Sequence, residues 1–150
     1  MIGQEGTRDL INRLVRYYFD AKEDYRLAAK RAIDPKVRDE LQGMVDRREQ
    51  FQVQLQQEVT RQGIEMSDNG HVGADFKRDW ERVRGSLAGH GFESALQLAA
   101  KSEKHAIDTI EQLQQGNLPP TISAMIGRHL VELRQAHVRI LNLVEHPISA

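Results

Sequence analysis

The stretch HLVELRQAH, residues 129–137, holds the side chains with the clearest potential for chemistry in this sequence. Two histidines and a glutamate, His129, Glu132 and His137, fall within one expected helix. Imidazole and carboxylate groups are ligands that zinc, iron and manganese accept in proteins. The stretch therefore raises the question of whether it forms a metal site or only contains core and surface residues that titrate.

Helical projection separates these three side chains. His129 lies near the centre of the apolar stripe, whereas His137 projects about 80° to one side of it and Glu132 about 60° to the other. Only His129 and Glu132, which are three residues apart, are neighbours on the helix surface. The spacing predicts an inward His129 and a marginal His137, and not three ligands on one face.

Polar residues also lie on the apolar stripes of the other three long helices. Arg48 and Glu103 fall near the centre of their stripes, and Tyr18 and Tyr25 lie on the stripe of the first helix. Each lies within about one turn of the middle of its own helix, so we expect them to meet His129 in one layer. A buried charge is costly unless it is paired. We therefore expect an Arg48–Glu103 ion pair, with His129 and a tyrosine satisfying the remaining donors and acceptors.

Four long helices and one short helix would position this layer. Thr7 precedes the first apolar run, Asp34-Pro35 is a helix start, and the sequence GNLPP marks a stop and restart. The expected helices span about 8–33, 35–62, 75–86, 92–115 and 120–145. The links inside each of two helix pairs are tight, and a long connection joins the second long helix to the third. This pattern predicts a single all-α domain, residues 1–150, with four-helix-bundle architecture and one crossover. A simple up-and-down bundle is the alternative.

Composition excludes several classes of protein. Hydrophobic residues are 39% and charged residues 29%, as in ordinary soluble helical domains. No cysteine occurs, so disulfide and thiolate chemistry are excluded. A net charge of −1 lacks the positive excess of a nucleic-acid-binding protein. Neither a membrane-spanning run nor a secretory segment is present. We therefore expect a cytoplasmic protein with no nucleic-acid partner and no membrane partner.

Several segments, taken in order, resemble one known family. They are LINRLVRYYFDAKEDYRLAAKRAIDPKVRDEL, RREQFQVQLQQEV, Gly70, Gly73 and Trp80, KSEKHA, and NLPP followed by QAH. Over residues 10–143 the chain resembles small bacterial ferritin-like four-helix-bundle proteins catalogued as a domain of unknown function. The resemblance implies a ferritin-like fold and a cytoplasmic, stress-associated role, and it implies no reaction. Acidic positions of the family near Lys22, Ala100 and Val138 are lost here, which weakens the case for metal binding.

The residue pattern does not favour a ferritin-type centre of two metal ions. Such a centre needs a glutamate from two helices and Glu-x-x-His from the other two, and no glutamate here has a histidine three residues later. The guanidinium of Arg48 cannot ligate a metal and would repel a dication. We therefore expect no cofactor and no catalytic residue, and interpret the chain as a structural or interaction module in which the Arg48 layer fixes helix register.

Two other functions stay open at this point. Iron or manganese bound by Glu103, His129 and Glu132 is the first alternative. A small-ligand carrier with a pocket between the helices beside Tyr18 and Tyr25 is the second. Both place the function in the same layer of the bundle.

The first helix also carries apolar residues outside its main stripe. Val15, Phe19 and Ile33 need cover from another surface. The short helix, through Phe76 and Trp80, or a second copy of the chain in a homodimer would supply it.

Overall fold

The computed structural model describes residues 4–66 and 91–146 of the chain. The described residues form the α-helices α1 (Gln4–Arg31), α2 (Pro35–Arg61), α4 (Gly91–Gln114) and α5 (Pro120–Glu145). No strand occurs among them, so the all-α fold class is confirmed. The expected short helix at 75–86 lies outside the described residues. None of the described helices combines the length and apolar character that crossing a membrane requires.

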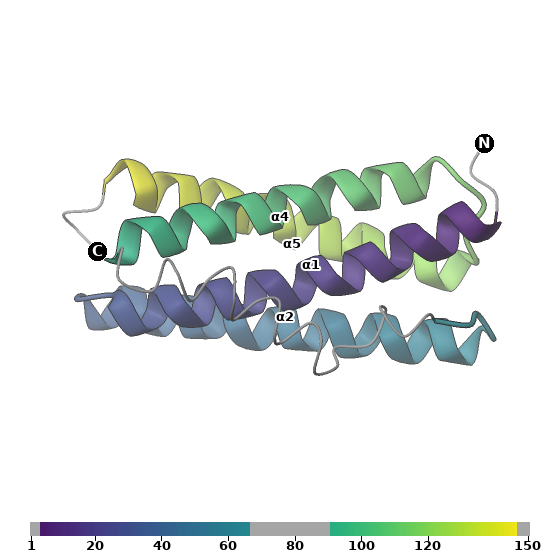
Figure 1. Cartoon of the computed structure of the whole chain (residues 1–150), viewed down its shortest axis with the longest axis horizontal. Helices are drawn as coiled ribbons and strands as arrows, with labels where there is room; N and C mark the ends of the chain where they lie inside the picture. Colours follow the sequence, from purple (N-terminus) through teal and green to yellow (C-terminus); the bar gives the residue numbers. More distant parts are fainter. Residues whose placement is uncertain (1–3, 67–90, 147–150) are drawn as a thin grey trace.

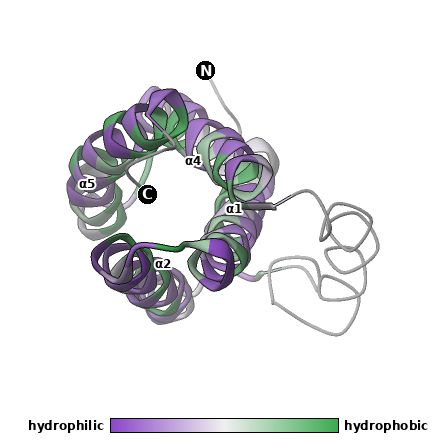
Figure 2. Cartoon of the chain, turned by 90° about the vertical axis from the view of Figure 1, so that its left-hand side faces the viewer, coloured by the Kyte–Doolittle hydropathy of each residue, from purple (hydrophilic) through white to green (hydrophobic). Residues whose placement is uncertain are grey.

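The four helices pack into a bundle in which neighbouring helices run antiparallel (Figure 1). Around the bundle axis their order is α1, α2, α5 and α4 (Figure 2). Because α2 ends at one end of the bundle and α4 begins at the other, the chain crosses the length of the bundle between them. The expected crossover is therefore confirmed, and the up-and-down alternative is wrong.

Local sequence explains the boundary between α1 and α2. Asp34 is extended (φ −76°, ψ 121°), and its Oδ1 accepts a hydrogen bond from the Lys36 backbone N–H at 2.8 Å. Pro35 occupies the first helical position, where no intrahelical hydrogen bond is lost. A proline disfavours helical geometry in the residue before it. Asp34 is therefore kept out of helical geometry, and α1 has already ended at Arg31, two residues before the expected end at 33.

The apolar core consists of two clusters, one in each half of the bundle. On α2, Val45 belongs to one cluster and Phe51 to the other; on α4, Ala100 and Ala106 are divided in the same way. Arg48 and Glu103 lie between these pairs in the sequence. The polar layer therefore interrupts the apolar core near its middle.

The seams between the helices differ in character. Alanines line α1 and α4 where these two helices face each other, and the small side chains let the helices approach closely. Among the four neighbouring pairs, α2 and α5 approach each other least closely. The contacts across that seam include several polar bridges, described below.

Two of the three residues expected to need cover are buried in the single chain. Val15 is fully buried and Phe19 is 2% exposed, whereas Ile33 remains 87% exposed. A second copy is therefore not required to cover Val15 or Phe19.

Candidate functional site

Arg48 and Glu103 form an ion pair at the centre of the bundle. The Arg48 Nε donates to Glu103 Oε1 at 2.8 Å, and Nη2 donates to Oε2 at 2.6 Å. The two side chains are 2% and 0% exposed. Burial lowers the pKa of Arg48, but the charge and hydrogen bonds of Glu103 outweigh burial and raise this pKa above its usual value. The guanidinium is therefore held charged in a two-bond geometry that uses both carboxylate oxygens.

Aromatic rings surround the guanidinium. The Arg48 Cζ lies 4.9 Å from the ring centroid of Phe51 and 5.8 Å from that of Tyr25, distances at which ring faces attract a cation. The buried Tyr25 hydroxyl is beside the pair but finds no hydrogen-bond partner among the described residues. Burial and the Glu103 charge raise the pKa of Tyr25 well above its usual value, so its phenol stays neutral.

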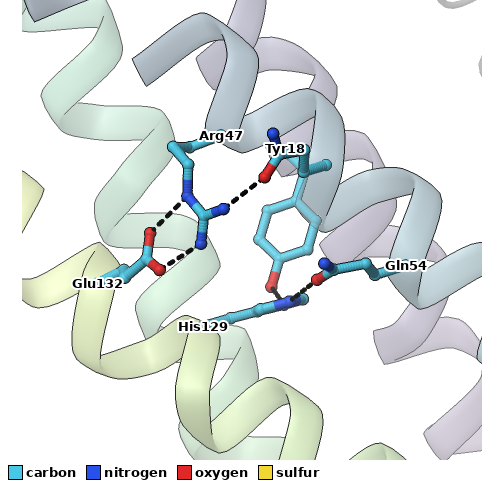
Figure 3. Close-up of polar contacts among 6 residues, drawn as sticks. Tyr18, Arg47, Gln54, His129 and Glu132 are labelled. Atoms are coloured by element: carbon cyan, nitrogen blue, oxygen red, sulfur yellow. Dashed lines mark hydrogen bonds and ion pairs between the residues drawn. The ribbon is translucent and has the colours of Figure 1, made fainter. Parts of the chain in front are cut away.

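A second network runs through His129 from the core to the α2–α5 seam (Figure 3). The Tyr18 hydroxyl lies 2.9 Å from His129 Nδ1, and His129 Nε2 lies 3.0 Å from Gln54 Oε1. The amide oxygen of Gln54 can only accept, so Nε2 carries the proton and Nδ1 accepts from Tyr18. The imidazole is stacked on Phe51, with 3.9 Å between ring centroids.

The electrostatics of this network agree with a neutral imidazole. Burial, and then the positive charge of Arg48, lower the pKa of His129 to about 4. Burial also raises the pKa of Tyr18 well above its usual value. At neutral pH, His129 is therefore an uncharged acceptor for a phenol that keeps its proton.

Two ion pairs join α2 to α5 nearer the surface. Arg47 donates two hydrogen bonds to the Glu132 carboxylate, one of them 3.0 Å long (Figure 3). Arg139 donates two hydrogen bonds to the Glu40 carboxylate, 2.7 and 2.9 Å long. Their side chains are between 34% and 43% exposed, so each pair contributes little to stability. Together the two ion pairs favour one register of α2 against the antiparallel α5.

Two polar contacts join α1 to its neighbours. Lys22 Nζ donates to Glu49 Oε2 on α2 at 2.6 Å, and Ser102 Oγ on α4 donates to Asp24 Oδ2 at 2.7 Å. Asp24 is completely buried.

The three residues of the alternative metal site, Glu103, His129 and Glu132, do not come together. Arg48 holds Glu103, Tyr18 and Gln54 hold His129, and Arg47 draws Glu132 across the seam. Among the described residues no group of three or more histidines and carboxylates is arranged to hold a metal ion. These donors therefore do not fit iron or manganese.

The layer also differs from the expected arrangement in one respect. His129 and a tyrosine do not complete the ion pair, because both imidazole nitrogens are engaged by Tyr18 and Gln54. Sequence reasoning missed Gln54, which is an exposed glutamine without a periodic signal. It also missed the seam ion pairs. Both helices carry a glutamate followed seven residues later by an arginine, Glu40 and Arg47 on α2 and Glu132 and Arg139 on α5, and this shared order becomes complementary between antiparallel helices.

Comparison with known proteins gives one family match. The model of a family described as a domain of unknown function (DUF2383) matches residues 7–115. That range includes α2, α4 and nearly all of α1, with the ion pair and both buried tyrosines, but not His129. No curated protein and no solved structure matches the chain.

Proposed function

The chain belongs to the DUF2383 family, and we propose that it is a non-catalytic structural or interaction module built on a ferritin-like bundle. The single crossover between two helix pairs supports the ferritin-like relationship, because ferritin-like bundles have one such connection. A bacterial cytoplasm and a stress-associated role complete the proposal, on the strength of the resemblance of the sequence.

One observation carries the non-catalytic part of the proposal: the acid and the base of the layer, Glu103 and His129, are both engaged by neighbouring side chains. Both oxygens of Glu103 accept from Arg48, and both nitrogens of His129 are bonded to side chains. The guanidinium of Arg48 balances the charge of Glu103, and the neutral imidazole of His129 keeps no nitrogen lone pair for a metal ion or a substrate. The layer therefore serves to hold the four helices in one register.

The metal content of the purified protein tests this proposal. After growth with added iron or manganese, we expect less than about a tenth of an equivalent of either metal per chain, because the fixed charge of Arg48 repels a dication. Elemental analysis by mass spectrometry measures this content. Near-stoichiometric metal that the variant Glu103→Gln fails to retain would overturn the proposal.

Self-association through α5 is the interaction that the exposed surface supports. Val131 and Val138 lie seven residues apart on one face of this helix and are 56% and 68% exposed. We expect light scattering at rising concentration to reach a mass near twice the 17.1 kDa of the chain. Val138→Lys should lower the dimer fraction, whereas Val53→Lys on α2 should not. A monomer at every concentration would remove the homodimer from the proposal.

A further inference from the structure

Ile33 is held in solvent at the tip of the bundle where α1 turns into α2. At 87% exposure it is the most exposed large apolar side chain among the described residues. The turn that carries it is fixed on both sides. Arg38 Nη2 donates to the Ala32 carbonyl at 3.0 Å, and Asp34 caps α2 through the Lys36 N–H. The exposure of Ile33 therefore follows from a defined backbone.

Positive charge is concentrated around this isoleucine. Four exposed cationic residues flank it in the sequence: Lys30, Arg31, Lys36 and Arg38. Asp34 is the one carboxylate between residues 30 and 38, and its Oδ1 is engaged as the helix cap. With the exposed Asp39 included, the turn still carries four cations against two carboxylates, in a chain whose net charge is −1.

Helix stability explains only half of these cations. Lys30 and Arg31 lie in the last turn of α1, where the helix dipole favours positive charge. Lys36 and Arg38 lie at the beginning of α2, where the dipole disfavours it, and the first turn of α2 has no acidic residue. The hydrogen bond of Arg38 to the Ala32 carbonyl gives that cation a structural role, so Lys36 is the one that the fold does not explain. A cation that opposes the helix dipole without structural benefit is typical of a functional surface.

The shape of the tip indicates the class of partner. A protein partner of standard size needs about 800 Å² on each side, whereas the feature in question is one exposed isoleucine and the cations beside it. A bilayer surface needs only a protruding apolar side chain and cations beside it. The carboxylates of Glu93 and Glu145, at the same end of the bundle on α4 and α5, confine the positive patch to the α1–α2 side.

We propose that the α1–α2 turn docks this end of the bundle on an anionic lipid surface, with Ile33 among the headgroups and Lys30 and Lys36 at the phosphates. This inference rests on the proposed interaction role, because it gives that role a partner. It departs from the expectation of no membrane partner, which rested on the absence of a membrane-spanning run and does not bear on peripheral contact. The contact is peripheral and weak, since one apolar side chain and a few charges hold it.

Vesicle co-sedimentation of the full chain tests the docking. At low ionic strength and millimolar lipid, we expect binding to phosphatidylcholine vesicles that contain phosphatidylglycerol, little binding to phosphatidylcholine alone, and loss of binding as salt is added. Each cation near the surface changes partition about fivefold. The double variant Lys30→Gln/Lys36→Gln should therefore bind about 25-fold more weakly, and Ile33→Asp at least about tenfold more weakly.

Matched variants elsewhere on the surface serve as controls. Val53→Asp on α2 and Lys101→Gln on α4 change exposed residues of similar type, away from the tip and from the α5 surface proposed for the dimer, and should bind like the parent. Equal binding to both kinds of vesicle, or turn variants that bind like the parent, would overturn the proposal. So would absence of vesicle binding combined with turn-dependent binding of polyglutamate, which would assign the tip to an acidic protein partner. Metal found in the buried layer would leave these vesicle results unchanged, so the two proposals can fail separately.

Discussion

Arg48→Met is expected to lower the free energy of unfolding by about 3–5 kcal/mol, because it leaves the Glu103 carboxylate buried without its partner. Glu103→Gln should be strongly destabilising for the matching reason, since it leaves the Arg48 guanidinium without a countercharge. Urea unfolding followed by circular dichroism measures both changes. In thermal melts, each single variant should lose on the order of 10 °C.

The double variant measures how much of the loss in stability comes from the interaction between the two side chains. Once neither charge is buried alone, Arg48→Met/Glu103→Gln should be less destabilised than the sum of the single variants, by about 2 kcal/mol. Arg47→Met and Glu132→Gln are the matched control, because this pair has the same residue types but is about 40% exposed. Their loss should stay below about 1 kcal/mol. Single Arg48 and Glu103 variants that melt like the parent would contradict the buried pair.

The position of the ion pair supports its proposed role in fixing the register of the helices. Apolar clusters lie on both sides of Arg48 and Glu103, so a slip of α2 against α4 by one turn would place a charge among aliphatic side chains. The energetic penalty of such a slip far exceeds the cost of misaligning two apolar stripes. A buried polar group that sets register in this way is known from coiled coils.

Helical periodicity was sufficient to predict the bundle and the inward residues. Arg48, Glu103 and His129 interrupt apolar stripes at a spacing that only inward positions explain, and Asp34-Pro35 carries both a cap and a helix-starting residue. These features depend on backbone geometry, which a sequence pattern reports directly.

The partners of the inward residues depend on information that periodicity does not contain. His129 turns to Tyr18 and Gln54, and Glu132 turns to Arg47, because of side-chain rotamers and the register of α2 against α5. Two residues three positions apart on one helix therefore join different networks. The residues of the alternative metal site therefore do not meet in the structure.

Acidification should destabilise the bundle through His129. Its pKa is lowered from 6.5 to about 4 in the folded protein, by burial and then by Arg48. As pH falls, the unfolded chain therefore takes up a proton before the folded chain does. The stabilisation is fully present above pH 6.5 and is lost as pH falls towards 4. From the size of the shift it amounts to roughly 3 kcal/mol.

Urea unfolding between pH 7.5 and 4.5 should reveal this loss, and His129→Gln identifies its source. The variant keeps a side-chain amide that can bond Tyr18 but removes the titrating group, so its stability should fall less steeply with acid. Glu132, whose pKa is lowered by its hydrogen bond to Arg47, loses its contribution only below about pH 4.5, outside this range. If the free energy of unfolding falls equally with pH in parent and variant, His129 is not a buried neutral imidazole. A buried neutral imidazole binds a proton less readily in the folded chain than in the unfolded chain.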